Sequence, residues 1–288
     1  MTETQKPTTP RVLIIAGSDS SGGAGIQADI KTCAAFGTYS ATAITAVTAQ
    51  NTMGVQQVEI MPAELVRAQI RSALLDIGAD VIKIGMLGNA EIIDVVAEEI
   101  EESDAFVILD PVMVATSGDA LLEDKAIDAL KTKLLPLADL ITPNVPEAEL
   151  LTVLEITDVD DLTKAGDALL KMNVYAALMK GGHLKGKSVV DVLVSEEGAN
   201  IMSGPRIHSR HTHGTGCTLA SAVAACMAQG APLEEAVVAA RDYVFHAIKT
   251  APGLGEGNGP LNHGLASGEA EEEPAPPGNN PFAALKDL

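Results

Sequence analysis

Val12-Leu-Ile-Ile-Ala16 is followed by Gly17-Ser-Asp-Ser-Ser-Gly-Gly-Ala-Gly25, and the chain then has helical spacing as far as Phe36. A short apolar run bounded by turn residues is typical of a buried strand. The glycines and small hydroxyl residues behind it let the backbone approach a ligand closely. This stretch predicts a strand, a ligand-binding loop and a helix, which together form the repeating unit of an α/β sheet.

The same alternation continues to about Thr250. Further strands are predicted at Ala43–Ala49, Val81–Ile84, Phe106–Leu109, Leu140–Thr142, Ala176–Met179 and Val189–Val194. Helices are predicted at Leu65–Ile77 behind Pro62, Glu91–Ile100, Gly216–Ala228 and Leu233–Lys249. This spacing predicts a mostly parallel central sheet with helical crossovers. In such sheets ligands bind at the carboxyl ends of the strands.

The composition supports that fold class and excludes some partners. Of the 288 residues, 47% are apolar and only 2% are aromatic, so the core must consist mainly of Ala, Val, Ile and Leu. That core suits a parallel sheet covered by helices on both faces. The net charge of -20 disfavours nucleic acid and anionic membrane surfaces as partners. A nucleotide is compatible with it, because backbone amides and a metal ion can hold phosphates locally.

The chain is expected to form one domain with two extensions. Residues 1–10 are polar and predict a flexible N-terminus, residues 11–265 form the domain, and residues 266–288 predict an acidic, Pro- and Gly-containing disordered tail. The end of the tail, 281–288, is read as a frayed terminus or a docking peptide. No stretch is long and apolar enough to span a membrane. Cys33, Cys217 and Cys226 lack disulfide or zinc spacing, which favours a cytoplasmic protein.

The glycine-rich loop is open to more than one interpretation. Gly23 stands where a Walker loop needs lysine. Gly23-Ala-Gly25-Ile-Gln-Ala28 fits a relaxed dinucleotide-binding pattern, but the acidic residue expected about twenty residues later is absent from Ser40–Gln50. The second strand ends instead in Gln50-Asn51, whose amides can pair with ring nitrogens and amino groups. A purely structural turn between strand and helix is the alternative.

His213-Gly-Thr-Gly-Cys-Thr218 precedes a helix rich in small residues. The amides of Gly214, Thr215 and Gly216 are expected to face developing negative charge at the helix N-terminus. Cys217 lies in the first turn, where the helix dipole favours a thiolate that can accept a proton from a substrate hydroxyl. The alternative is that Cys217 is only a small residue at a helix start.

Several polar residues follow predicted strands and therefore share one edge of the sheet. Asp110 and Glu147 are candidates for holding a hydrated Mg²⁺, Asn144 lies three residues before Glu147, and Lys180 is a candidate for binding phosphate. Helix caps or surface ion pairs are the alternative for each. The spacings of His183, His208, His211 and His213 do not fit a metal site.

Together these residues resemble the ribokinase-like family, and more closely its hydroxymethylpyrimidine/phosphomethylpyrimidine kinases of thiamine biosynthesis. The resemblance covers about Arg11 to His263. The motifs that carry it are Ala16-Gly-Ser-Asp-Ser-Ser-Gly-Gly-Ala-Gly-Ile-Gln-Ala-Asp29, Thr45-Ala-Val-Thr-Ala-Gln-Asn-Thr52, Lys83-Ile-Gly-Met-Leu87, Asp110-Pro-Val-Met113, Thr142-Pro-Asn-Val-Pro-Glu-Ala148, Met179-Lys-Gly-Gly-His183 and Thr212-His-Gly-Thr-Gly-Cys-Thr218.

The resemblance implies a ribokinase-like three-layer α/β/α sandwich, a homodimer, and two successive phosphorylations that depend on ATP and Mg²⁺. It implies that Gln50 binds the aminopyrimidine and that Asp29, Gly17 and Met86 line the same pocket. Gly214 to Gly216 would form the anion hole, and Cys217 would replace the aspartate base of the sugar kinases. Asn144 and Glu147 would organise the metal, with Asp110 and Lys180 assisting at the metal and the phosphate.

Three alternatives to this function remain open at the level of sequence. A pyridoxal kinase has similar glycine and cysteine motifs, although Gln50-Asn51 and Lys180-Gly-Gly-His183 resemble the pyrimidine kinases more. A dinucleotide oxidoreductase and a binding protein without catalysis are the other two. Residues 115–120 and 253–259 are candidate mobile loops by composition.

Overall fold

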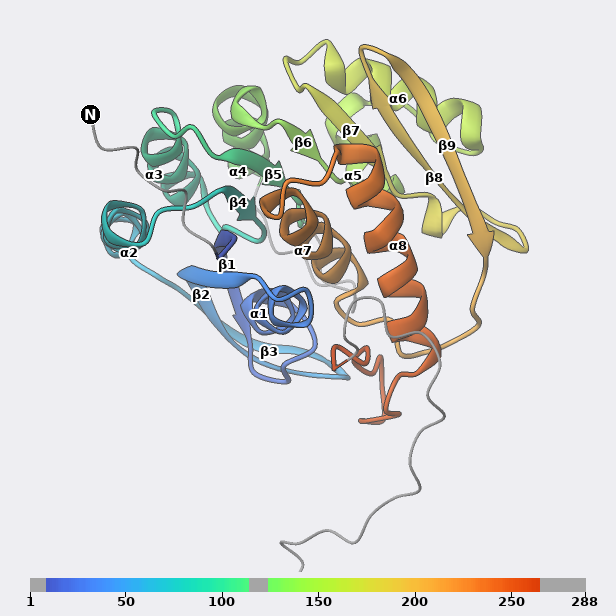
Figure 1. Ribbon diagram of the computed structural model, residues 1–288, viewed down its shortest axis with the longest axis horizontal. Helices are drawn as coiled ribbons and strands as arrows, with labels where there is room; N and C mark the ends of the chain where they lie inside the picture. The colour runs from blue at the N-terminus through green and yellow to red at the C-terminus, as the bar shows by residue number, and fades with distance from the viewer. Residues whose placement is uncertain (1–8, 114–123, 265–288) are drawn as a thin grey trace, which may run out of the picture.

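The structure is a computed structural model that describes residues 9–113 and 124–264. Its centre is one nine-stranded sheet in the order β3-β2-β1-β4-β5-β6-β7-β8-β9 (Figure 1). The pairings from β2 through β7 are parallel, and β3, β8 and β9 are added antiparallel at the two edges. The strands are β1 (Arg11–Asp19), β2 (Tyr39–Asn51), β3 (Gly54–Ile60), β4 (Val81–Ile84), β5 (Phe106–Leu109), β6 (Leu140–Ile141), β7 (Ala176–Met179), β8 (Ser188–Ser195) and β9 (Gly198–Pro205).

Helices cover both faces of this sheet, which confirms the three-layer α/β/α sandwich (Figure 1). One layer contains α1 (Gly25–Ala35), α7 (Thr215–Ala228) and α8 (Leu233–Lys249). The other contains α2 (Ala63–Asp76), α3 (Ala90–Ile100), α4 (Asp124–Ala129), α5 (Val145–Thr152) and α6 (Val159–Leu170). Short π- and 3-10 turns at Leu130–Leu134, Leu135–Leu137 and Gly181–His183 complete the elements.

Side-chain alternation along the strands explains why the two cores are separate. Leu13 and Ile15 of β1 pack into the core beneath α2 and α3, whereas Val12 and Ile14 pack into the core beneath α1 and α7. Successive residues of a strand point to opposite faces, so a continuous apolar run is needed when both faces are covered. The apolar runs predict this double burial correctly.

The structure adds elements that the sequence analysis did not predict. The strands β3 and β9 pair antiparallel at the sheet edges, and they contain polar or small residues such as Gln56, Gln57 and Ser203. β1 continues to Asp19, so the glycine-rich loop begins inside the strand rather than at Gly17. The helices between residues 124 and 170 were not predicted individually.

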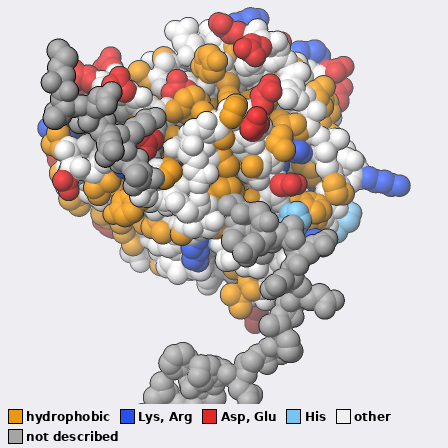
Figure 2. All heavy atoms as spheres, viewed as in Figure 1, with side chains coloured by type: hydrophobic (Ala, Val, Ile, Leu, Met, Phe, Trp, Pro, Cys, Tyr) orange, Lys and Arg blue, Asp and Glu red, His pale blue; other side chains and the backbone are white. Residues whose placement is uncertain are grey.

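Other expectations concern the ends and loops of the domain. Residues 253–259 are held in place, because Asn258 donates to the Thr52 carbonyl oxygen at 2.8 Å and Gly257 donates to Thr52 Oγ1 at 3.2 Å. The candidate loop 115–120 and the tail 266–288 lie outside the described residues. Within residues 9–113 and 124–264, every helix is too short or too polar to cross a bilayer. Acidic side chains are dispersed over the face seen in Figure 2, in keeping with the net charge of -20.

Candidate active site

A cavity of about 970 Å³ lies at the carboxyl ends of the parallel strands. It is where a doubly covered sheet is expected to bind its ligand. Among its lining residues are nearly all the candidates chosen from the sequence, which are Gly17, Gln50, Met86, Asp110, Asn144, Glu147, Lys180, Gly214, Thr215, Gly216 and Cys217. The N-terminus of α7 closes one side, so its first turn faces the strand ends.

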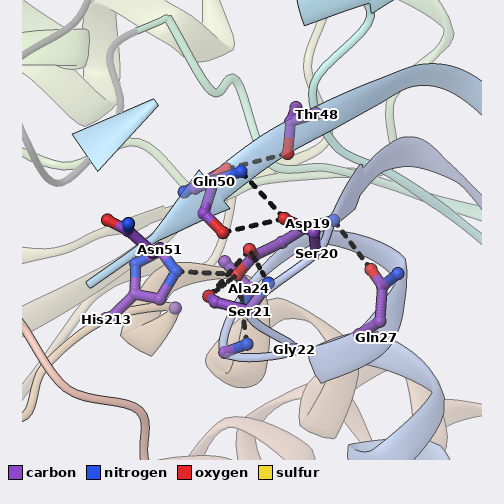
Figure 3. Close-up of polar contacts among 12 residues, drawn as sticks. Asp19, Ser20, Ser21, Gly22, Ala24, Gln27, Thr48, Gln50, Asn51 and His213 are labelled. Carbon is purple, nitrogen blue, oxygen red and sulfur yellow. Dashed lines mark hydrogen bonds and ion pairs between the residues drawn. The ribbon is translucent and has the colours of Figure 1, made fainter. Parts of the chain in front are cut away.

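Asp19, at the end of β1, organises the glycine-rich turn (Figure 3). Its carboxylate accepts hydrogen bonds from the amides of Ser21, Gly23 and Ala24 at 2.8 to 3.1 Å. Burial acts to raise the pKa of Asp19, but the hydrogen bonds from His213 and Ser21 outweigh it and hold that pKa below its usual range. Asp19 is therefore ionised at neutral pH and acts as an acceptor for the whole turn.

Gln50 lies at the end of β2 and faces the cavity. Its backbone is fixed by Ser20, whose hydroxyl donates to the Gln50 carbonyl oxygen and accepts from the Gln50 amide, both at 2.8 Å (Figure 3). Thr48 Oγ1 lies 3.2 Å from Gln50 Oε1 and 2.8 Å from the Ser18 carbonyl oxygen, so its single proton is shared between these two acceptors. The structure therefore fixes the Gln50 backbone and presents its side-chain amide to a ligand in the cavity.

The expectation that Asp29 lines the pocket is wrong in this structure. Asp29 lies on the buried face of α1, is 0% exposed, and is absent from the cavity wall. Both of its oxygens lie 3.0 Å from Lys83 Nζ, and Ser221 Oγ donates to it at 2.6 Å. Burial acts to lower the pKa of Lys83, but the Asp29 charge outweighs it and raises that pKa. Of this buried pair, Lys83 is the residue that lies against the cavity wall.

Lys180, after β7, and Asp110, after β5, form an ion pair with an Nζ to Oδ1 distance of 2.9 Å. Thr142 Oγ1 donates to the same Asp110 oxygen at 2.9 Å, and Glu147 Oε2 lies 4.0 Å from Lys180 Nζ. Burial acts to lower the pKa of Lys180, but the charges of Asp110 and Glu147 outweigh it and raise that pKa. The Lys180 side chain is therefore a fixed positive charge.

The turn before α7 lies beside this charge. A methyl group on Gly216 would be 3.1 Å from Lys180 Nζ, so the first turn of the helix and the ammonium face the same volume. Gly214 has φ 80°, and a methyl group there would collide with the Gly23 carbonyl oxygen. Glycine at this position allows the α7 turn to lie directly on the glycine-rich turn.

The expected thiolate of Cys217 is wrong for the ligand-free site. Burial is the largest influence and raises the pKa of Cys217 to about 11, although the nearby Lys83 charge acts to lower it. Desolvation of the thiolate therefore outweighs the Lys83 charge and the backbone hydrogen bond at Gly25. Cys217 lines the cavity as a thiol at neutral pH.

Asn144 and Glu147 form a capping box at the start of α5, so the helix-cap alternative is correct for this pair. Asn144 Oδ1 accepts from the Glu147 amide at 3.0 Å, and Glu147 Oε2 accepts from the Asn144 amide at 2.8 Å. Burial raises the pKa of Glu147 to about 7, against the opposing effect of Lys180, and the Asp110 charge adds to the rise.

These carboxylates fit a metal ion that also binds phosphate. Within the described residues no three His, Cys, Asp or Glu side chains converge as a metal cage. Mg²⁺ is usually held by one or two carboxylates, water and substrate phosphates rather than by a full protein cage. Asp110 and Glu147 supply two carboxylates on the wall of one cavity, and a bound cation would favour the ionised form of Glu147 that burial disfavours.

Sequence reasoning missed several residues that shape the cavity. Lys83 is a lysine within the buried run Val81–Ile84, and that exception to the apolar pattern is a signal that could have been used. Asp19 and His213 are 194 residues apart in the chain, so no local sequence pattern predicts that they pair. A second part of the cavity wall was also missed. It is formed by β8, by α8 and by the end of β9 with the residue that follows it, and it includes Val189, Arg206, Val238, Val244, Phe245 and Ile248.

Comparisons with known proteins agree with this architecture. The profile of the phosphomethylpyrimidine kinase family matches residues 19–262. A hydroxymethylpyrimidine/phosphomethylpyrimidine kinase of Streptomyces coelicolor is 49% identical over 93% of this chain and 100% of its own length. The crystal structure of a Clostridium difficile phosphomethylpyrimidine kinase is 42% identical, covers 83% of this chain and 99% of its own, and has a TM-score of 0.75.

A pyridoxal kinase of Bacillus subtilis, solved as an ADP complex, has the same fold. It is 37% identical, covers 90% of this chain and 98% of its own, and has a TM-score of 0.83. The kinase relatives match nearly the full domain, and all the residues of the cavity except Ala16, Gly17 and Ser18 belong to the region that the family profile matches. The chain therefore belongs to the phosphomethylpyrimidine kinase family.

Proposed function

We propose that the protein is an ATP-dependent kinase that phosphorylates hydroxymethylpyrimidine and then the resulting monophosphate, in thiamine biosynthesis. The observation that carries the proposal is the joining of two kinds of site in one cavity of a family member. One part offers an oriented amide for a heterocycle, and the other offers fixed positive charge and helix N-terminal amides for phosphate.

The pyrimidine is expected to bind where Gln50, Gly17 and Met86 face the cavity. An amide can donate and accept at once, which suits a ring nitrogen beside an amino group. A methyl group on Gly17 would lie 3.0 Å from Met86 Sδ, so glycine leaves room for a flat ring against the methionine. Asp29 acts in this proposal only through Lys83.

Phosphoryl transfer needs positioning and charge neutralisation more than covalent catalysis. Lys180 and the amides of Gly214, Thr215 and Gly216 would neutralise the transferred phosphoryl group. In the first transfer an O–P bond forms to the substrate hydroxyl, ADP leaves, and the hydroxyl proton passes to Cys217. This role is limited to the fraction of Cys217 that has lost its own proton, because its pKa is raised to about 11.

The second transfer starts from a phosphate monoester, which is already ionised near neutral pH and needs no base. Asp110 and Glu147 would hold Mg²⁺ with the nucleotide phosphates, and the metal would supply neutralisation of charge on those phosphates. The apolar outer wall, with Val189, Val244 and Phe245, suits the flat face of the adenine base.

The test is a mass-spectrometric assay with ATP and Mg²⁺ in which hydroxymethylpyrimidine and pyridoxal compete. Two successive phosphate additions to the pyrimidine are expected. Pyridoxal is the second candidate because pyridoxal kinases share this fold at 34–37% identity. Phosphate on pyridoxal alone would keep the mechanism and overturn the substrate. A Gln50→Leu variant should lose the pyrimidine products while ADP binding remains.

The assembly and location of the protein are also part of the proposal. We infer a homodimer in the cytoplasm, supported by the resemblance to homodimeric kinases, by the use of ATP, and by free Cys33, Cys217 and Cys226. Sedimentation analysis at micromolar concentration should give twice the mass of one chain. A concentration-independent single-chain mass would contradict the dimer.

A further inference from the structure

The glycine-rich turn and the anion-hole turn are packed directly on each other. A methyl group on Gly23 would collide with the His213 ring and lie 3.1 Å from Pro260 Cβ. A methyl group on Gly214 would collide with the backbone of Gly23 and Ala24. Two loops that come from opposite ends of the chain therefore form a single surface of the cavity.

One buried polar contact joins the two turns. His213 Nε2 lies 2.8 Å from Asp19 Oδ2, and the two residues are 5% and 2% exposed (Figure 3). Because an ionised carboxylate only accepts hydrogen bonds, His213 Nε2 must carry the proton and donate it. The His213 backbone is fixed separately, since its amide donates to the Gly259 carbonyl oxygen at 3.1 Å.

The same Asp19 is connected to the substrate side of the cavity. The neighbouring Ser20 holds the backbone of Gln50 through two hydrogen bonds of 2.8 Å. Thr48 bridges the two strands, because its hydroxyl donates to the Ser18 carbonyl oxygen at 2.8 Å and lies 3.2 Å from Gln50 Oε1. A continuous set of contacts therefore runs from Gln50 through the Asp19 turn to His213 (Figure 3), which directly precedes Gly214 in the chain.

We propose that Asp19 and His213 are a pair of positioning residues that hold the anion hole at a set distance from the pyrimidine anchored on Gln50. The inference rests on the proposed function. A shift of about 1 Å between a bound substrate and a catalytic group can lower a rate by roughly a hundredfold. The pair keeps Gly214 to Gly216 from moving relative to Gln50 by such an amount. His213 Nε2 donates to Asp19 and therefore cannot itself accept a proton from the substrate hydroxyl.

Three substitutions at His213 separate positioning from simple filling of space. The amide nitrogen of glutamine can take the place of Nε2, that of asparagine is too short and mimics Nδ1, and alanine has no donor. We expect His213→Gln to keep kcat within about threefold, and His213→Asn and His213→Ala to lower kcat for both transfers on the order of tenfold to a hundredfold. His208→Ala is the matched control, since His208 is exposed and lies outside the cavity wall.

The discriminating measurement is the split between kcat and pyrimidine affinity. Gln50 keeps its contacts with Ser20 and Thr48 in every His213 variant, so the Kd of hydroxymethylpyrimidine by calorimetry should change by less than about threefold. In a double-mutant cycle, His213→Ala should add little loss once Asp19→Asn is present. If the alanine variant fails to fold, comparison of His213→Asn with His213→Gln still tests the proposal.

A low kcat in the asparagine variant, a kcat close to wild type in the glutamine variant and an unchanged Kd for the pyrimidine support the positioning pair. Wild-type kcat in the asparagine variant overturns it, as does a fall in kcat matched by an equal rise in Kd, which indicates general loosening. A wild-type protein that adds no phosphate to the pyrimidine overturns the proposed function, and this inference with it.

Discussion

Cys217 shows at the scale of one residue how burial can outweigh a nearby positive charge. Because its pKa is raised to about 11, the thiolate fraction grows with pH throughout the neutral and alkaline range. The first transfer should therefore speed up with rising pH in the wild type. Cys217→Ala should remove that slope and slow the first transfer more than the second. Separate pH–rate profiles on the alcohol and on the monophosphate measure this, and equal losses in both transfers would refute a base role.

Glu147 is expected to make metal binding depend on pH. Its ordinary pKa is 4.5 and its pKa here is about 7, so in this window the folded protein holds a proton that the unfolded chain has lost. The stability of the ligand-free fold therefore falls as pH rises from about 4.5 to about 7. A bound cation needs the carboxylate, so Mg²⁺ should oppose that loss.

The measurement is the rise in Tm on adding Mg²⁺ and ADP. It should be larger at about pH 8 than at about pH 6 in the wild type, because the proton on Glu147 competes with the metal. In Glu147→Gln the rise in Tm should differ less between about pH 6 and about pH 8. The difference that remains then reports the titration of the nucleotide alone. If the rise in Tm depends on pH equally in the wild type and in Glu147→Gln, Glu147 is not a metal-binding residue.

The place of a side chain was predicted correctly where it lay at the end of a strand, and wrongly where its partner was far along the chain. Gln50 ends β2, Asp110 and Lys180 follow β5 and β7, and the topology brings all three to one cavity. Asp29 belongs to the same motif as the glycine turn, but the helical period turns it to the buried side, where Lys83 and Ser221 hold it. Those partners lie 54 and 192 residues away, and nothing local indicates them.

At the scale of an element, α7 begins and ends with a left-handed glycine. Gly214 has φ 80° and lies on the Gly23 backbone, whereas Gly230, just past the other end, has φ 91° and an open surrounding. Gly230→Ala should lower the free energy of unfolding by about 1 kcal/mol, the cost of a left-handed backbone for a residue with a side chain. Gly214→Ala should cost at least about 2 kcal/mol, because collision adds to strain.

Urea unfolding measures both changes, and the kinase assay separates their effects. Gly230→Ala should keep its activity, while Gly214→Ala should lose it together with its stability. Equal destabilisation of the two variants would mean that contact between the two turns contributes nothing to the stability of the fold.

Elements were predicted best where apolar runs are buried on both faces. Val81–Ile84 and Ala176–Met179 are fully buried and lie where they were predicted. The strand β3 has no buried residue, and Gln56, Gln57 and Glu59 interrupt its apolar residues, so it lacks the continuous apolar run of a buried strand. Edge strands need only one neighbour and one covered face, and their sequences are correspondingly less constrained.

At the scale of the whole molecule, the net charge of -20 is expected to oppose compaction. Salt shortens the Debye length from about 30 Å at 0.01 M to about 8 Å at 0.15 M, which screens repulsion between distant surface carboxylates. Tm should therefore rise by a few degrees over this range of KCl. Calorimetry at about pH 8 without nucleotide tests this, and a Tm that is constant or falls would show that local ion pairs dominate instead.

The three-layer architecture places the two ends of the domain side by side. Asp19 meets His213 across 194 residues and Asp29 meets Ser221 across 192. On the ribosome, at about 5–20 residues per second, the N-terminal strand and helix must wait roughly 10 to 40 s for those partners to be synthesised. The nascent kinase is therefore inactive until translation of the domain is nearly finished. Stalled chains that end before α7 should remain sensitive to protease cleavage within α1.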